Sequence, residues 1–176
     1  MLSASISARS KAKINLFLHV TGKRPDGYHL LDSLVAFPDF AYDVVTLSSA
    51  EGFSFEMTGP FADTLKGQQA ERENLVTMAH GLLQNFASRK LHCFISLEKN
   101  LPIGSGMGGG SSNAATTVRL MENYFDLGLS DEIRNHTLVM LGADVAICHM
   151  AKPSYFSGIG DIIAPAPPLP QLYILL

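Results

Sequence analysis

Residues 101–115 read LPIGSGMGGGSSNAA, and five of the seven residues at 104–110 are glycine. Glycine loses more conformational freedom on folding than any other residue, so such a stretch is costly inside a helix or a strand. Chains accept this cost where the backbone takes positive φ angles or lets a ligand approach closely. Three favoured N-cap residues, Ser111, Ser112 and Asn113, come next, followed by apolar residues at helical spacing. The sequence therefore predicts a glycine-rich loop, a cap and then a helix.

The junction between this loop and the helix predicts an anion site. The first N–H groups of a helix lack acceptors within the helix, and the helix dipole places partial positive charge at the same end. Phosphate is an anion that this arrangement often binds. A flexible surface loop is the alternative, but linkers are usually strongly polar, whereas this stretch contains Leu101, Ile103 and Met107.

The loop departs from three common phosphate-binding patterns. A P-loop needs a lysine directly after its last glycine, and this loop has none. Gly104, Gly106 and Gly109 fit the G-x-G-x-x-G pattern of dinucleotide-binding folds, but they do not follow directly from a strand. The acidic residue of that pattern should end a second strand, whereas the sequence around Glu122 and Asp126 reads as a helix end. A protein-kinase loop would be followed by a strand of the V-A-I-K type, and none follows.

A proline, a glycine-rich loop, two serines and a helix of small residues, in that order, resemble the second motif of the GHMP kinases. This superfamily contains galactokinase, homoserine kinase, mevalonate kinase and phosphomevalonate kinase. Three further motifs stand in order along the chain: AKINLFL at 12–18, RPDGYH at 24–29 and LGADV at 141–145. Together the four motifs resemble one family, the 4-diphosphocytidyl-2-C-methyl-D-erythritol kinases of the non-mevalonate route to isoprenoids. The resemblance covers residues 8–176. It departs from the family at FAYD (40–43), where a glycine usually precedes the aspartate.

Composition indicates a well-buried globular protein. The 176 residues are 47% apolar and 16% charged, against a usual charged share of ~25%. The net charge of −3 gives no general attraction to nucleic acid or to anionic lipid. No apolar run approaches the ~18 residues that suggest a membrane span. Residues 1–10 lack the apolar centre of a signal peptide. We therefore expect a cytoplasmic protein without nucleic-acid or membrane partners.

The cysteines and histidines predict neither a disulfide nor a metal site. Cys93 and Cys148 stand in apolar surroundings, which favours buried free thiols. The histidines outside the motifs lack metal-ligand spacing, and these are His19, His80, His92, His136 and His149.

The order of the predicted elements is typical of an α+β fold. Period-two alternation predicts a strand over residues 8–20, with Lys13 in its middle and Ile14 and Leu16 on the opposite face. Further strands are expected over residues 30–37, 44–47, 53–57 and 92–97, the earlier ones as a meander. Helices are expected to begin after Asn74, after the glycine-rich loop and at Ser130, the last ending near Gly142. The resemblance makes the fold class a GHMP-kinase N-terminal domain, with a ribosomal-protein-S5-like mixed sheet and helices packed on one side.

The resemblance also predicts the domain organisation. Residues 1–165 correspond to the N-terminal ATP-binding domain, and residues 166–176 to a linker and the first strand of a C-terminal domain that is missing. The last five residues, LYILL, read as a strand that stops. Members of the family continue for roughly another hundred residues, about one further domain, which carries half of the substrate site and a third glycine-rich motif. We therefore expect a truncated chain that is inactive by itself.

The resemblance implies a kinase that transfers the γ-phosphate of ATP, with Mg²⁺, to the 2-hydroxyl of 4-diphosphocytidyl-2-C-methyl-D-erythritol. Asp144 would be the base and Lys13 the cation that stabilises transferred charge. The cytidine diphosphate derivative, a small-molecule substrate, would contact Asn15, Tyr28 and His29. The residues implied in ATP binding are Asn74, Lys99, Pro102, Ile103, Gly104, Ser105, Gly106, Met107, Gly108, Gly109, Gly110, Ser111 and Ser112. A homodimer is one of the assemblies that the sequence leaves open.

Ordinary structural roles are available for most of these residues. Lys13 alone reads as a solvated lysine on a strand, and Asp144 as a turn or capping aspartate. Tyr28 reads as an aromatic residue beside a turn, and Asn74 as a helix cap. Two other functions also stay open: a nucleotide- or protein-binding module without turnover, and a GHMP kinase for a different alcohol. The turn at residues 26–29 argues against the different alcohol.

Overall fold

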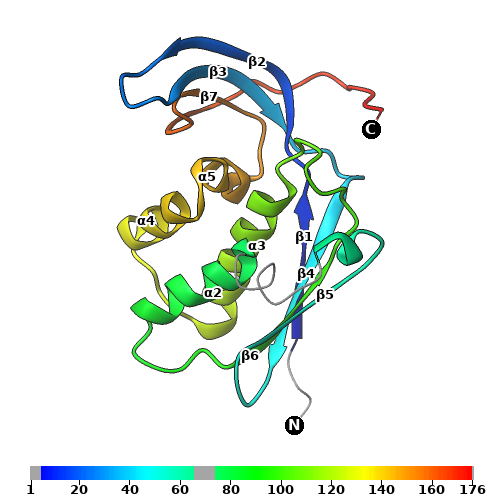
Figure 1. The fold of residues 1–176 in the computed structure, drawn as a ribbon, viewed down its shortest axis with the longest axis vertical. Helices are drawn as coiled ribbons and strands as arrows, with labels where there is room; N and C mark the ends of the chain where they lie inside the picture. Colours follow the sequence, from blue (N-terminus) through cyan, green and yellow to red (C-terminus); the bar gives the residue numbers. More distant parts are fainter. Residues whose placement is uncertain (1–4, 66–73, 176) are drawn as a thin grey trace.

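The computed structural model describes residues 5–65 and 74–175 of the chain. The strands are β1 (Ser5–Lys11), β2 (Ile14–Lys23), β3 (His29–Ala36), β4 (Tyr42–Ser49), β5 (Ser54–Thr58), β6 (Cys93–Glu98), β7 (Ser154–Gly158) and β8 (Ile162–Pro165). The helices are η1 (Ala62–Leu65, a 3₁₀ helix), α2 (Leu75–Phe86), α3 (Gly109–Phe125), α4 (Asp131–Leu141) and α5 (Ala143–Met150). The strands of this part of the chain form two four-stranded sheets, with the orders β1-β4-β6-β5 and β2-β3-β7-β8 (Figure 1).

The first sheet is mixed and is covered by helices on one side. Strand β4 pairs antiparallel with β1 and β6, whereas β5 pairs parallel with β6. Alternate residues of β4 and β6 are buried, as the two-residue period of a strand requires when one face meets a core. Helices α2 to α5 lie on the same side of this sheet (Figure 1). The predicted α+β fold, with a mixed sheet and helices on one side, is confirmed.

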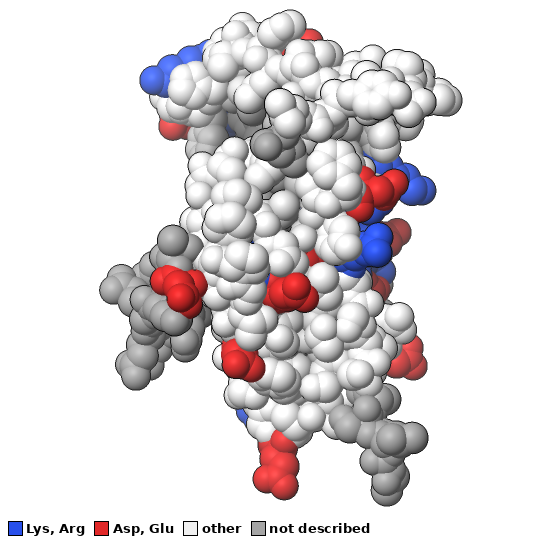
Figure 2. All heavy atoms as spheres, turned by 90° about the vertical axis from the view of Figure 1, so that its right-hand side faces the viewer, with Lys and Arg blue, Asp and Glu red and all other residues white. Residues whose placement is uncertain are grey.

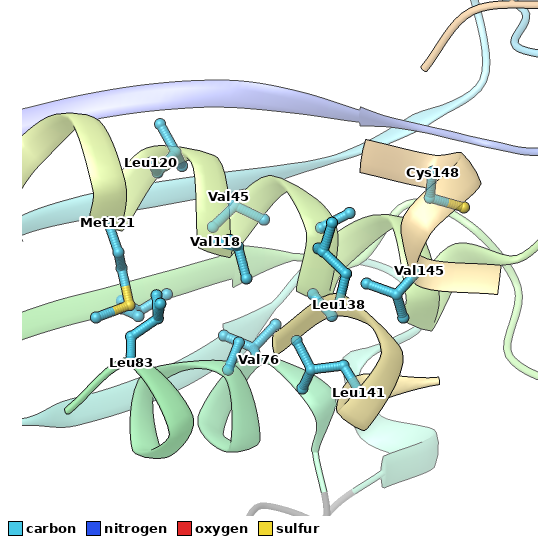
Figure 3. Close-up of a cluster of buried hydrophobic side chains, with 14 of the residues drawn as sticks. Val45, Val76, Leu83, Val118, Leu120, Met121, Leu138, Leu141, Val145 and Cys148 are labelled. Atoms are coloured by element: carbon cyan, nitrogen blue, oxygen red, sulfur yellow. The ribbon is translucent and has the colours of Figure 1, made fainter. Parts of the chain in front are cut away.

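Helix α3 lies at the centre of the core. It packs against α2, α4 and α5 and against strands β1 and β4. Figure 3 shows Leu83 of α2 beside Met121 of α3, and Leu138 and Leu141 of α4 close to Val145 of α5. Residues 114–117 of α3 are small and fully buried, which lets neighbouring elements approach the helix closely. Burial of this apolar surface is the main force that holds the helices on the sheet.

The strand predicted over residues 8–20 is two strands in different sheets. The chain leaves the ladder at Ala12 and Lys13, whose N–H groups donate to Ala41 O (2.9 Å) and Met107 O (2.8 Å). Lys13 is therefore not mid-strand, as the alternation suggested, but lies at the crossing between the sheets. Leu16 and Leu18 are 37% and 51% exposed, and β2 is an outer strand of the second sheet in the described structure.

One further strand prediction is wrong. The early strands are not a meander, because β3 pairs with β2 and β7 while β4 pairs with β1 and β6. Residues 172–175 pair with no described strand, and Tyr173 and Leu175 are 91% and 99% exposed, so their assignment to the first strand of a further domain stays a prediction.

The predicted starts of two helices are confirmed. Asn74 accepts a hydrogen bond from Val76 N (2.9 Å), and Ser130 accepts one from Ile133 N (3.3 Å). Both are N-cap side chains that satisfy an N–H group of the first turn. Gly142 follows the last residue of α4, as predicted.

The cysteines and the charged surface are also described by the structure. Cys93 and Cys148 are free and buried, as predicted, and burial raises the pKa of each thiol to about 11.

On the face shown in Figure 2, basic and acidic side chains lie next to one another along one edge. No helix within residues 5–65 or 74–175 is long and apolar enough to cross a membrane.

His80 is a buried histidine in α2. Its Nε2 lies 2.9 Å from Leu91 O, and it is the donor because a carbonyl oxygen only accepts. The ring also stacks on Phe53, with centroids 3.7 Å apart. Burial lowers the pKa of His80 from its ordinary value of 6.5, against the opposing effect of the hydrogen bond to Leu91. The folded chain therefore holds this imidazole in its neutral form.

We expect the contribution of His80 to the free energy of unfolding to be full above pH 6.5 and to fall as the pH drops below it. The reason is that His80 takes up a proton more readily in the unfolded chain than in the folded one. His80→Gln keeps a donor but cannot titrate, so it should lose less stability than the parent between about pH 7.5 and about pH 5. Urea unfolding midpoints at the two pH values measure this difference. His136→Gln, an exposed change on α4, should keep the parent's pH dependence. A parent-like pH dependence in His80→Gln would contradict the assignment.

Candidate active site

The structure brings Lys13 and Asp144 together across 131 residues of sequence. Lys13 Nζ donates a hydrogen bond to Asp144 Oδ2 at 2.8 Å. The Lys13 side chain is only 5% exposed, whereas the Asp144 side chain is 42% exposed. Asp144 Oδ1 accepts no hydrogen bond from the described residues. A buried cation is thus neutralised by a partly exposed carboxylate.

Two different elements place these side chains. Lys13 lies at the crossing between the sheets, with its Nζ 5.4 Å from the centroid of the Phe156 ring in β7. Aromatic faces attract cations, so this ring adds a favourable contact for a buried ammonium. Asp144 lies in the first turn of α5, directly after the glycine that ends α4. A carboxylate at this end of a helix is stabilised by the helix dipole.

The glycine-rich loop lines a cavity of about 330 Å³ beside the start of α3, together with Leu75 and Lys99. Gly104, Gly106 and Gly108 have φ angles of 70°, 76° and 61°, which explains glycine at these positions. The loop residues that line the cavity are Pro102, Ile103, Gly104, Ser105, Gly106, Met107, Gly108, Gly109, Gly110 and Ser111. The first-turn N–H groups of α3 have no acceptor within the helix. The cavity therefore lies against unpaired donors and the positive end of the helix dipole.

Helix α3 begins earlier than the serines predicted. Gly108 is its N-cap, and Ser112 N donates to Gly108 O at 2.9 Å, so the serines lie inside the first turn. The left-handed conformation of Gly108 turns the chain into the helix, and no side chain of the described structure caps it. The side chains of Ser112 and Asn113 have tertiary partners instead: Ser112 Oγ donates to Lys11 O, and Asn113 Nδ2 donates to Asp43 Oδ2.

Asp43 is a site residue that the sequence reasoning missed. Its side chain is fully buried on β4, and Lys99 Nζ donates to its Oδ2 at 2.7 Å. The ammonium of Lys99, which we expected to contact ATP, is thus engaged by Asp43 and by Leu101 O at 2.6 Å. A signal was present in the sequence, because Asp43 shares the buried face of β4 with Val45 and Leu47. A charge at such a position needs a buried partner.

Four predicted residues remain: Asn15, Tyr28, His29 and Asn74. Asn15 Nδ2 donates to Ser33 Oγ at 2.7 Å, and Asn74 serves as the cap of α2. Tyr28 is 62% exposed and lines a second cavity of about 640 Å³ together with Gly142 and Ala143, which directly precede Asp144. His29 is exposed at the start of β3. The structure thus brings together the loop, Lys13 and Asp144, and places Tyr28 on a neighbouring cavity.

The sequence is similar to that of known kinases over nearly its whole length. Residues 73–164 match the family model for the N-terminal domain of GHMP kinases. The chain is 47% identical over 167 residues to a 4-diphosphocytidyl-2-C-methyl-D-erythritol kinase of Chelativorans sp. (strain BNC1). The aligned region covers 94% of this chain and 55% of that relative. It is 44% identical to the kinase of the same name from Ruegeria pomeroyi, and this alignment covers 98% of this chain and 58% of the relative. The chain therefore spans about half the length of the curated relatives that it matches.

Solved structures agree with this similarity. A crystal structure of 4-(cytidine 5'-diphospho)-2C-methyl-D-erythritol kinase superposes with a TM-score of 0.74 at 29% identity, covering 92% of this chain and 55% of the other. A mevalonate kinase of L. major, solved with R-mevalonate, superposes with a TM-score of 0.62 at 18% identity. This superposition covers 93% of this chain and 52% of the mevalonate kinase. At that identity the likeness to the mevalonate kinase shows a shared fold alone.

We expect Gly108→Ala to lower the free energy of unfolding by about 1–3 kcal/mol, because a Cβ disfavours positive φ. The new Cβ would also lie 3.2 Å from Lys13 Cβ. Gly81→Ala, in the exposed face of α2 with nothing within 4 Å of the new Cβ, should instead raise it by about 0.5–1 kcal/mol. Urea denaturation of both variants measures the difference. Equal effects of the two substitutions would contradict the role assigned to Gly108.

Proposed function

Since the chain belongs to the GHMP kinases, we propose that it forms the ATP-binding part of a kinase for 4-diphosphocytidyl-2-C-methyl-D-erythritol. The product would carry a phosphate on the 2-hydroxyl, as in the non-mevalonate route to isoprenoids. The observation that carries this proposal is the ion pair between Lys13 and Asp144 beside the glycine-rich loop. Identities of 39–47% to the relatives of that name support the choice of substrate.

The loop and the start of α3 would bind the phosphates of ATP. The donors would be first-turn N–H groups, which are unpaired within the helix and lie against the loop cavity. Positive φ angles at three glycines bring the backbone around this cavity without side chains in the way. Phosphoryl transfer depends mainly on such positioning and on stabilisation of charge.

Asp144 and Lys13 would carry out the transfer step. The carboxylate of Asp144 takes the proton of the substrate hydroxyl as the hydroxyl oxygen forms its bond to the γ-phosphorus. The bond from that phosphorus to the bridging oxygen breaks, and ADP leaves with the electron pair. The ammonium of Lys13, held 2.8 Å from Asp144 Oδ2, stabilises the negative charge that develops on the transferred group.

The described residues fit a magnesium ion that is bound largely through phosphate. Mg²⁺ keeps several waters and usually needs only one or two carboxylates in addition to substrate phosphates. The hydroxyl of Ser111, which lines the loop cavity, would be the protein ligand, and phosphate oxygens and waters would supply the others, which leaves Asp144 free to act as the base. When bound, the ion neutralises charge on the phosphates.

The cavity beside Tyr28 would hold the cytidine end of the substrate. Its volume of about 640 Å³ suits a small-molecule ligand. The half-exposed ring of Tyr28 offers a stacking surface for a base, and Gly142 and Ala143 connect the cavity to Asp144. Asn15 and His29 would complete the contacts from β2 and β3. The proposal also includes a cytoplasmic location and residues 1–165 as the ATP-binding domain.

We expect Asp144→Asn to lower kcat by about 10²–10⁴-fold, because it removes the general base and keeps the shape of the side chain. Activity is measured in this chain extended by the C-terminal part of the Chelativorans relative. The affinity for ATP should stay near that of the parent. Asp126→Asn, an exposed change at the other end of α3, is the matched control and should keep full activity. Turnover by Asp144→Asn at the parent rate would contradict the proposal.

We expect the 176-residue chain to bind ATP but to turn over far more slowly than an ordinary enzyme, which reaches about 10 s⁻¹. The family resemblance implies that half of the substrate site and a third glycine-rich motif lie in the part of the relatives that this chain does not span. Calorimetric titration with ATP and a coupled ADP assay on the chain measure the two properties. Binding without turnover would favour the nucleotide-binding module for this chain. Turnover near about 10 s⁻¹ would show that the chain alone is a kinase.

A further inference from the structure

We propose that Asp43 and Lys99 are positioning residues that hold both ends of the glycine-rich loop in the geometry that binds phosphate. This inference rests on the proposed function, because it concerns the same loop. Neither residue would need to touch ATP. Their effect would pass through the backbone of the loop and the start of α3.

A single carboxylate connects the two ends of the loop. Before the loop, Asp43 Oδ1 accepts hydrogen bonds from Asn100 N and Leu101 N, both at 2.7 Å. After the loop, Asp43 Oδ2 accepts one from Asn113 Nδ2 at 2.9 Å. Since residues 102–108 lie between these anchors, the position of Asp43 constrains how far apart the ends of the loop can lie.

Lys99 adds a second tie at the beginning of the loop. Its Nζ donates to Asp43 Oδ2 at 2.7 Å and to Leu101 O at 2.6 Å. Both backbone polar groups of Leu101, its N–H and its carbonyl oxygen, are therefore held by the pair. Leu101 is itself buried in a small apolar cluster with Ala12 and Ala41. The residue that precedes the loop is thus fixed by polar and apolar contacts together.

The pair lies directly against the first residue of α3. A Cβ on Gly109 would lie 3.4 Å from Lys99 Nζ and 3.7 Å from Asp43 Oδ2. The absence of a side chain at Gly109 therefore lets the helix start rest on the pair. Because the two charges neutralise each other, Lys99 offers no free charge to a phosphate. What the pair supplies is the placement of the N–H groups above it.

The free-energy cost of burying both charges supports a role of Asp43 and Lys99 beyond packing. A buried ion pair is often no more stabilising than well-packed apolar residues of the same volume, because both charges lose their hydration. Asp43 and Lys99 are 0% and 5% exposed, so both bear this cost. An apolar pair would fill the space but could not bind the N–H and carbonyl groups of Leu101.

The test is the double variant Asp43→Asn with Lys99→Met, which removes both charges together. Asn113 Oδ1 is buried without a partner in the described structure. Rotation of the Asn113 amide lets this oxygen accept a hydrogen bond from the asparagine side chain introduced at position 43. We expect the double variant to fold and to bind ATP about 10–100-fold more weakly, since small displacements of binding groups cost this much. Amide hydrogen exchange without ligand should rise at residues 101–111 and stay unchanged in β4 and β6. In the extended kinase, KM for ATP should rise while KM for the cytidine substrate stays unchanged.

The control removes an ion pair of the same type from the surface. Asp39→Asn deletes the surface pair with Lys11 at the end of β1 and should leave ATP affinity and loop exchange unchanged. Parent-like ATP affinity and loop exchange in the Asp43/Lys99 double variant would overturn the inference. If that variant does not fold, Asn113→Ala decides by the same two measurements, because it removes the tie after the loop and leaves the buried ion pair intact. A parent chain that does not bind ATP would contradict the proposed function, whereas the loop exchange would still test the positioning.

Discussion

The position at which helix α3 begins determines the geometry of the whole candidate site. Gly108 turns the chain into the helix with a φ of 61°, and three contacts from distant segments hold this turn. Lys13 N donates to Met107 O, Ser112 Oγ donates to Lys11 O, and Asn113 Nδ2 donates to Asp43 Oδ2. The same crossing of the chain that holds the helix start also carries Lys13. The proposed phosphate donors and Lys13, the proposed catalytic cation, are therefore placed by one junction between the two sheets.

The ion pair between Lys13 and Asp144 has features that suit phosphoryl transfer. A buried ammonium without a partner would be strongly unfavourable, and Asp144 together with the Phe156 ring offsets this cost. The cation is thus oriented before any ligand binds, and no reorganisation is needed when charge develops. The carboxylate is more exposed than the ammonium, and one of its oxygens, Oδ2, holds Lys13. The pair thereby combines a fixed positive charge with a partly exposed carboxylate, the group proposed as the base.

Local signals in the sequence predicted local structure well and distant contacts poorly. The caps Asn74 and Ser130 were predicted because a cap is determined by its own first turn. The break at Lys13 was missed, because alternation continues through residues 8–20 and the change of sheet depends on which strands pair. The sequence predicts the serines as caps, but Gly108 starts the helix and Ser112 is bonded to Lys11 instead. Asp43 was missed because its partners lie 56 to 70 residues away. Lys13 and Asp144 were paired only through the family resemblance.

We expect ATP phosphates to bind at the start of α3, beside the pair of Lys13 and Asp144. A ¹H–¹⁵N spectrum of the chain, titrated with a non-hydrolysable ATP analogue and Mg²⁺, tests this binding site. The largest shifts should occur at the amides of residues 104–111 and of Lys13, whose N–H is bonded to Met107 O. Shifts confined to the second sheet, or to the outer strand β5, would contradict it.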